Sequence, residues 1–152
     1  PAGIGEPVFD KLDATLAKAM LSIGAVKGFE IGDGFLAATA TGSTTNDAIG
    51  IQDEQVKKQT NHSGGVLGGM SDGDEIVFRV AVKPTPSISQ AQQTVDLHGQ
   101  ERQIEIHGRH DPVIVPRAVV VVESMAAITL VDALFANMSA RMDAIVDFYQ
   151  KR

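Results

Sequence analysis

Residues 75–83 read EIVFRVAVK, and they alternate between apolar and mixed positions as a half-buried β-strand does. One face of this predicted strand is wholly apolar and consists of Ile76, Phe78, Val80 and Val82. The other face carries two cations, Arg79 and Lys83. These cations are either solvated or they line a site for an anion.

The neighbouring segments predict more strands. Residues 71–74, SDGD, form a strong turn signal, so we expect a hairpin between the apolar run before it and the strand 75–83. A short strand is expected at 25–31, and a second hairpin at 94–107 that turns near Gly99 and Gln100. Residues 32–62 are polar and show little periodicity, and we expect 42–59 to be a flexible loop.

Two helices are expected, one near each end of the chain. Pro7 suits a first helical turn, and apolar residues then recur at helical spacing as far as Ile23. The second helix is expected to enter at Pro116 and to continue without a breaker to Tyr149. The β-branched run 119–122 also suits a strand, but the pattern around it favours a helix. Together these elements predict one α+β domain over 1–152, with helices packed on an antiparallel sheet.

Composition excludes several classes of protein. The 152 residues are 43% hydrophobic, which is enough for a core, and the net charge of −6 disfavours a nucleic-acid surface. No cysteine is present, so disulfides and thiolate metal sites are excluded, which fits a reducing compartment. The longest apolar stretch contains Glu123 and Asp132, and we expect no membrane span. The N-terminus has neither signal-peptide features nor an initiator Met, so we expect a processed chain or a piece of a longer one.

Two short polar segments are candidates for chemistry. In KPTPS, residues 83–87, a lysine and two hydroxyls stand beside rigid prolines and could hold a phosphate, although an ordinary strand exit has the same composition. In GRHDP, residues 108–112, Arg109 could bind a phosphate or carboxylate and Asp111 could accept a proton. A solvated turn before a helix is the alternative for this segment.

Other sites have less support. The glycines at 64–65 and 68–69 could let a flat cofactor approach the backbone, or they could simply form turns, and they match neither a P-loop nor a dinucleotide fingerprint. The four histidines lack a set of carboxylate partners, so no metal is expected, and there is no G-x-S-x-G segment of a serine hydrolase. The residues alone therefore predict an anion-binding α+β domain.

Three long segments in register resemble the C-terminal portion of the chorismate synthase family. They are GEPVFDKLDATLAKAMLSIGAVKGFEIGDGF, TNHSGGVLGGMSDGDEIVFRVAVKPTPSI and GRHDPVIVPRAVVVVESMAA, which begin at residues 5, 60 and 108. Val113 stands where the family often has Cys, and Val120 stands where it often has Pro. Neither departure removes a polar group that we assign to the chemistry. The resemblance implies half of the family's β-α-β sandwich fold.

The resemblance also implies site residues. Gly24, Ala25 and Gly68 match backbone contacts with FMN, and Arg109 matches an arginine near flavin and substrate. The stretch that holds the flavin and its phosphate end is matched by Lys83, Pro84, Thr85, Pro86 and Ser87. Asp111 matches the catalytic carboxylate that assists proton removal through the flavin N5. Asn61 and His110 are expected to support these contacts.

The activity that the resemblance implies is that of a carbon–oxygen lyase acting on phosphates. Chorismate synthases convert 5-enolpyruvylshikimate 3-phosphate to chorismate by a 1,4-anti-elimination that requires reduced FMN, in the shikimate pathway of aromatic amino-acid biosynthesis. The resemblance further implies a cytoplasmic homotetramer with no nucleic-acid or membrane partner. NADP is expected to matter for members that reduce their own flavin, as some fungal members do.

The resemblance covers only the C-terminal part of the family's proteins. The N-terminal half supplies the histidines thought to act as acids, a serine that pairs with the catalytic aspartate, and several substrate arginines, and it has no counterpart in these 152 residues. The alternative function is therefore a folded fragment that contributes to FMN binding or oligomerisation but is inactive alone.

Overall fold

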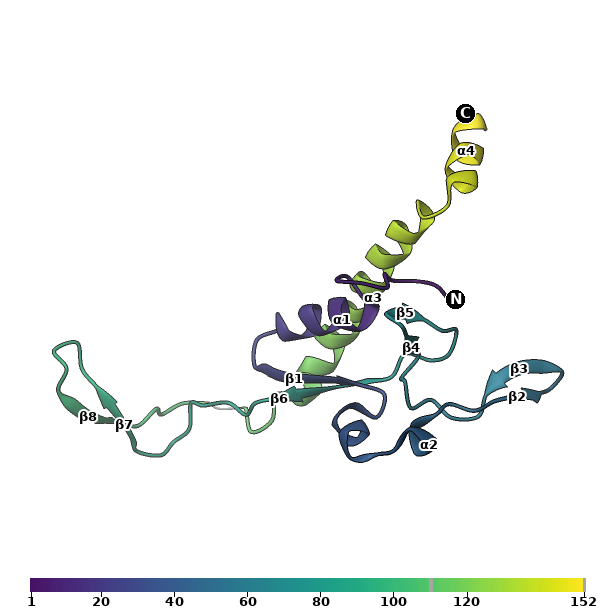
Figure 1. Cartoon of the computed structure of the whole chain (residues 1–152). Helices are drawn as coiled ribbons and strands as arrows, with labels where there is room; N and C mark the ends of the chain where they lie inside the picture. The colour runs from purple at the N-terminus through teal and green to yellow at the C-terminus, as the bar shows by residue number, and fades with distance from the viewer. Residues whose placement is uncertain (110, 152) are drawn as a thin grey trace.

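The computed structural model describes residues 1–109 and 111–151 and shows an α+β fold with a small body and projecting arms (Figure 1). The body contains two helices and one pair of strands from distant parts of the chain. In chain order the elements are α1 (Leu12–Leu21), β1 (Val26–Ile31), η1 (Gly34–Thr39), α2 (Gly42–Thr45), β2 (Ile49–Gln52), β3 (Gln55–Lys58), β4 (Val66–Leu67), β5 (Met70–Ser71), β6 (Phe78–Val82), β7 (Gln92–Val95), β8 (Glu101–Ile104), α3 (Val115–Met138) and α4 (Met142–Gln150).

Helix α1 supplies half of the buried apolar residues of the described chain. Leu12, Leu16 and Met20 are fully buried, because their spacing places them on one face of the helix. The expected start at Pro7 is wrong, since the chain bends at Phe9, which has a φ of 59° and is 91% exposed. The helix begins instead at Leu12, whose amide would lack an intrahelical partner and donates to the carbonyl of Gly69 across 2.8 Å.

Strands β1 and β6 form an antiparallel pair beneath α1. The register runs from Val26 opposite Val82 to Ile31 opposite Phe78, with a bulge next to Val26. The rings of Phe29 and Phe78 lie 5.4 Å apart across the pair. Helix α1 packs on both β1 and α3, and residues of all three elements meet at Leu12 and Leu16, so these elements form the body.

The hairpin expected across residues 71–74 is wrong, because β6 pairs with β1 and not with the preceding apolar run. That run, β4, pairs with β5. Gly68 and Gly69 connect β4 and β5 and have φ values of 62° and 90°, which suits a two-residue turn of the kind that joins adjacent strands. The turn is therefore tighter, and comes earlier, than the sequence predicts.

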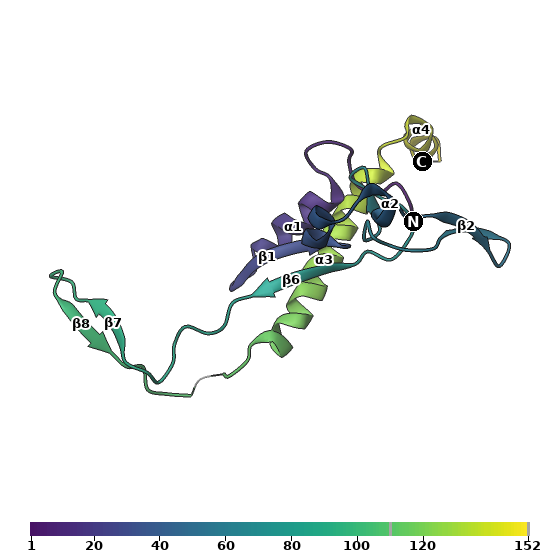
Figure 2. The same ribbon diagram turned by 60° about the horizontal axis from the view of Figure 1, so that its bottom comes forward.

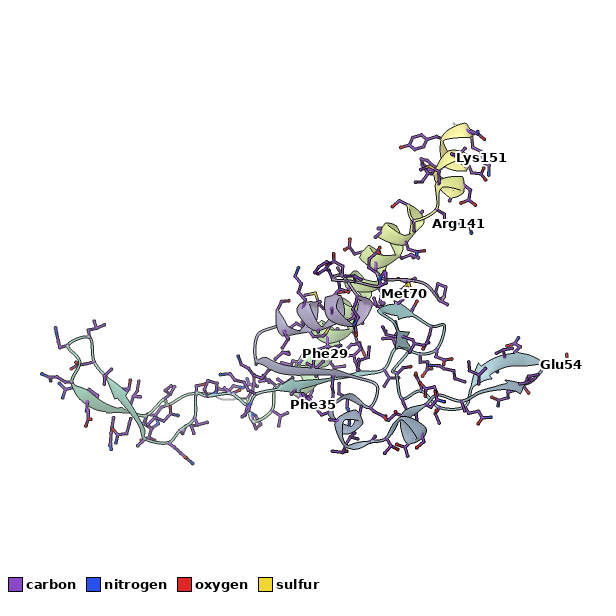
Figure 3. The ribbon with its side chains drawn as sticks, in the orientation of Figure 1. Phe29, Phe35, Glu54, Met70, Arg141 and Lys151 are labelled. Atoms are coloured by element: carbon purple, nitrogen blue, oxygen red, sulfur yellow. The ribbon has the colours of Figure 1, made fainter. Side chains whose placement is uncertain are left out.

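Residues 42–59 carry local structure where the sequence predicts a loop. They contain α2 and the β2–β3 hairpin, whose turn residues Asp53 and Glu54 both have positive φ. The hairpin projects from the body, with Glu54 at its tip (Figure 3). The flexibility of this segment stays a prediction.

The β7–β8 hairpin confirms the second predicted hairpin, and it lies far from the body at the end of a long arm (Figure 2). Asp96 closes its turn by accepting hydrogen bonds from the amides of His98 and Gln100, at 2.9 and 3.0 Å. The arm leaves the body after β6 and rejoins it before α3.

The C-terminal helix is shorter than expected. Helix α3 confirms a helix over the ambiguous run 119–122, but it ends at Met138. The amides of Ser139 and Ala140 bond back to the last turn, and Arg141 is extended, so α4 points in a new direction (Figure 1). Helix α3 is strongly apolar although it carries Arg117, Glu123 and Asp132, and its length and composition would suffice to cross a membrane.

Candidate functional site

Two segments predicted to bind the cofactor lie side by side at one end of the β1–β6 pair. The backbone amide of Lys83 donates to the carbonyl oxygen of Ala25 across 2.8 Å, and Val26 lies opposite Val82 in the adjacent register position. The antiparallel pairing of β1 with β6 therefore brings the Gly24–Ala25 turn to the start of KPTPS. The two segments are nearly sixty residues apart in the chain.

The backbone of the Gly24–Ala25 turn is open and strained. A side chain added at Gly24 would meet no atom within 4 Å. Ala25 has a φ of 71°, in the left-handed region that costs a residue with a Cβ about 1 kcal/mol or more. An open, strained turn at the end of a strand pair is a site at which a flat ligand can approach the main chain.

The KPTPS segment presents a cation and two hydroxyls next to this turn. Lys83 is exposed, and the hydroxyl-bearing Thr85 and Ser87 are half-buried. Pro84 and Pro86 are exposed, and the carbonyl of Pro86 accepts a hydrogen bond from Gln92 at 3.2 Å. In the part of the chain that the structure describes, neither hydroxyl has a hydrogen-bond partner. The segment can therefore offer these donors to an anionic ligand.

Arg109 and Asp111 of the GRHDP segment lie between β8 and α3, on the return leg of the arm, and Asp111 is held there by an ion pair. Arg109 is exposed, and Arg117 Nη1 lies 2.7 Å from Asp111 Oδ2. His110, expected to support the site, lies outside the described residues. Between β6 and the first turns of α3 is a hollow of about 200 Å³, lined by apolar side chains and Glu123. The end of the strand that leads to KPTPS thus lies near the helix that follows GRHDP.

Gly68 lies elsewhere. The neighbouring Gly69 carbonyl bonds to Leu12 at the start of α1, whereas Gly24 and Ala25 follow the end of this helix. Ten helical residues span about 15 Å, so the described chain does not bring Gly68 to the Ala25–Lys83 site. Its backbone is open, since an added Cβ would meet nothing within 4 Å. Its contact with FMN stays a prediction.

Arg79 and Lys83, the two cations predicted on one strand face, differ in whether they have an ion-pair partner. Arg79 Nε lies 2.9 Å from Glu30 Oε1 on the paired strand, so its charge is already compensated. Lys83 forms no ion pair with a described residue. The alternative of an anion site is thus supported for Lys83 alone.

A cluster around Lys58 organises the glycine-rich turns, and sequence reasoning missed it. Lys58 Nζ lies 2.7 Å from Asp72, 3.0 Å from Asp74 and 3.7 Å from Asp47. It also donates to Asn61 at 3.3 Å and to Ser63 at 3.1 Å. The ammonium thus joins three segments, and no local spacing in the sequence marks a cluster of this kind.

Two carboxylates of this cluster, Asp47 and Asp72, have lowered pKa values. Partial burial alone would raise the pKa of Asp47, but hydrogen bonds from the amide of His62, the hydroxyl of Thr60 and Ser63 outweigh it and hold the pKa well below its usual range. Burial also opposes ionisation of Asp72, whose pKa is nevertheless lowered by the hydrogen bond from Lys58. Burial would lower the pKa of Lys58, but its hydrogen bonds and charge interactions with Asp72 and Asp74 outweigh burial and raise the pKa.

Asn61 and His62 have structural partners. Asn61 accepts from the amide of Gly65 at 2.8 Å and donates to the carbonyl of Glu75 at 2.9 Å, so it shapes the glycine turn. His62 Nδ1 lies 2.7 Å from Asp33 Oδ2. Among residues 1–109 and 111–151, no group of three His, Cys, Asp or Glu could hold a metal ion.

Comparison with known proteins gives the family. The chorismate synthase family model matches residues 1–135. The chorismate synthase of Agathobacter rectalis is 66% identical over 151 residues, which cover 99% of this chain and 41% of that protein. That of Lachnospira eligens is 67% identical over 149 residues, covering 98% of this chain and 41% of that protein.

A solved structure gives the same result. A crystal structure of a chorismate synthase superposes with a TM-score of 0.70 at 34% identity, and the match covers 99% of this chain and 39% of that one. The chain thus spans about 41% of the length of the curated relatives it matches. It belongs to the chorismate synthase family.

Proposed function

We propose that this chain forms one wall of the active site of a chorismate synthase. The complete protein would convert 5-enolpyruvylshikimate 3-phosphate to chorismate. One observation carries the proposal: the Lys83–Ala25 hydrogen bond joins two segments that the family resemblance assigns to FMN. Asp111, assigned to the proton transfer, stands on the return leg of the arm that starts at these segments.

The residues at this end of the body fit FMN. Gly24 leaves room for a flat ring against the backbone, and Lys83 with Thr85 and Ser87 offers a cation and hydroxyls to a phosphate. Arg109 adds a second exposed cation. A substrate with a phosphate and carboxylates needs such local positive charge, which a net charge of −6 does not prevent.

The residues of this chain would hold the reactants and accept a proton. Phosphate leaves with the electrons of its C–O bond, a ring proton is lost, and a new double bond forms, so the reaction is redox-neutral. Reduced FMN, when bound, supplies electron density to the breaking C–O bond and recovers it. Lys83 and Arg109 compensate the charge of the bound anions, and the carboxylate of Asp111 assists removal of the proton.

Helix α3 indicates that more protein completes this site. None of its strongly apolar span is buried, and a helix as hydrophobic as this one is normally covered. The chain spans about 41% of its relatives, so the remainder of the protein is our proposed cover, and no membrane is needed. We also propose a cytoplasmic homotetramer that binds no nucleic acid. Whether NADP serves flavin reduction stays a prediction.

The exposure of apolar surface also favours the alternative function, an inactive folded fragment, for the 152-residue chain by itself. Its buried apolar side chains are few: Ile4, Leu12, Leu16, Met20, Val26 and Val66 among the described residues. The segments assigned to FMN are largely exposed. A folded fragment that contributes to FMN binding or to oligomerisation, but is inactive alone, agrees with this exposure.

Flavin titration of the full-length protein tests the proposal. Replacement of Lys83 by Met should weaken binding of reduced FMN by about tenfold, which corresponds to the loss of one charge-assisted contact. Lys57→Met is the matched control, because Lys57 pairs with Asp53 on the β2–β3 hairpin, away from the site. Equal FMN affinity in the Lys83 variant and the control would contradict the proposed wall.

A further inference from the structure

Asp111 is held by an arginine that the family resemblance does not assign to the reaction. Arg117 Nη1 donates to Asp111 Oδ2 across 2.7 Å. The other carboxylate oxygen, Oδ1, receives no hydrogen bond from a residue that the structure describes. The ion pair therefore fixes one oxygen of the carboxylate and leaves the second available to a proton.

The position of Arg117 is unfavourable for the helix that carries it. Helix α3 starts at Val115, its first turn contains no acidic residue, and Arg117 lies in this turn. The positive end of the helix dipole disfavours a cation at this place by a few tenths of a kcal/mol or more. A first-turn arginine is thus poorly explained by helix stability, and its ion pair with Asp111 gives it a separate role.

The pair also connects a segment without regular secondary structure to a helix. Asp111 belongs to the return leg of the arm, whereas Arg117 is anchored in α3, with its amide bonded to Ile114. Because each residue between Asp111 and Arg117 has two soft backbone dihedrals, an ion pair that spans six residues restrains where the carboxylate points. Surface ion pairs contribute little stability, so orientation is the larger effect expected here.

We propose that Arg117 is a positioning residue, which orients the carboxylate of Asp111 for the proton removal that it assists. This inference rests on the proposed function, since it takes Asp111 as the group that assists proton removal. A plain surface ion pair and a direct ligand of the substrate are the two competing roles for Arg117. The three roles predict different kinetics: positioning lowers kcat, a substrate ligand raises KM, and a surface ion pair changes neither.

The test is steady-state kinetics of the full-length holoenzyme with Arg117→Met and Arg117→Lys. Misplacement of the carboxylate should lower kcat of Arg117→Met by about 10- to 100-fold, with little change in KM. The affinity for FMN and the urea midpoint should stay near those of the wild type. Arg117→Lys should recover part of kcat, because it keeps the charge without the planar fork.

Arg141→Met is the matched control. Arg141 pairs with Asp143 at the start of α4, so it reproduces an arginine–aspartate pair at a helix start outside the proposed site. This control should leave kcat unchanged. The decisive comparison combines Arg117→Met with Asp111→Asn: if Arg117 acts through Asp111, the double variant should be no slower than Asp111→Asn alone.

Several results would overturn the inference. A raised KM at unchanged kcat would make Arg117 a substrate ligand, and an unchanged kcat and KM would make the pair a surface contact. Additive losses in the double variant would also contradict positioning. Failure of the proposed function is distinguishable, because the wild-type protein would then form no chorismate, or Asp111→Asn would leave turnover unchanged.

Discussion

The amide of Lys83 and the carbonyl of Ala25 are joined by a hydrogen bond of 2.8 Å at the end of the β1–β6 pair. Strand pairing, not proximity in the sequence, creates this contact. It brings the open backbone of the Gly24–Ala25 turn and the ammonium-bearing residue Lys83 to the same end of the strand pair. The proposed flavin wall depends on this geometry, so changes in the Ala25 turn should affect binding and stability together.

Substitution of Ala25 tests the strained turn. Ala25→Gly should leave stability within about 1 kcal/mol of the wild type, because relief of strain is partly offset by the greater entropy of unfolded Gly. Ala25→Val should cost about 1–2 kcal/mol and weaken FMN binding, since a β-branched residue is strongly disfavoured at a φ of 71°. Urea unfolding and flavin titration measure the two effects. A valine variant equal to the wild type would show that this turn is relaxed in the complete protein.

The Lys58 cluster should dominate the stability of the glycine-rich turns. The Lys58 side chain is 14% exposed and its ammonium lies among three carboxylates, so Lys58→Met should lower the free energy of unfolding by about 3 kcal/mol. Lys57→Met changes the adjacent, exposed lysine and should cost less than about 0.5 kcal/mol. Denaturant titration of both variants measures the difference. Similar midpoints would mean that the cluster contributes no more than a surface pair.

Acid should weaken the same cluster. The pKa values of Asp47 and Asp72 are lowered in the folded state, so their ionised forms stabilise the fold above the unfolded pKa of about 3.9. This stability should fall progressively as the pH drops below about 4 and through the lowered folded-state values, because the unfolded chain then binds more protons. Unfolding free energies between pH 5 and pH 2 test this. Asp47→Asn should flatten the dependence, and an unchanged slope would contradict the assignment.

Asp111 should matter to turnover more than to binding. Asp111→Asn in the full-length protein should lower kcat by about 10²- to 10⁴-fold, the range for loss of a general acid–base group. FMN affinity should change far less. Asp143→Asn, which alters the acidic partner of Arg141 in α4, serves as the control. Equal losses of turnover and flavin binding would instead indicate a structural role for Asp111.

Local patterns allowed several elements to be predicted. The β7–β8 hairpin follows from its alternating strands and from a turn that Asp96 closes, and helix α3 follows from an uninterrupted apolar pattern. The run 119–122 proved helical although its β-branched residues also suit a strand. These features depend on neighbours in the sequence, so one sequence was sufficient.

Features that depend on distant contacts were predicted less well. The pairing of β6 with β1 displaced the hairpin that the SDGD turn suggested, because Gly68 and Gly69 already close a tighter one. Helix α1 starts late because the Gly69 carbonyl, far along the chain, receives its first amide. The Lys58 cluster joins segments at 47, 58 and 72, which no local spacing reveals.

For the site, the sequence indicated the right residue types but not their grouping. KPTPS and the Gly24–Ala25 turn came together, whereas Gly68 lies at the opposite end of α1. A role for Arg117 was not predicted, because its ion pair with Asp111 depends on how the arm returns to α3. The separation of Gly68 from the Ala25–Lys83 site could not be predicted. A glycine motif indicates that the backbone is flexible or open, but not where in the fold it lies.

Anaerobic formation of chorismate is the most direct measurement of the central claim, that this chain is one wall of a larger active site. The full-length protein and the 152-residue chain should each be incubated with reduced FMN and 5-enolpyruvylshikimate 3-phosphate. We expect the full-length protein to form chorismate and phosphate in equal amounts without net flavin oxidation, and the 152-residue chain to form none. No chorismate from the full-length protein, or an equal rate from the 152-residue chain, would contradict the account.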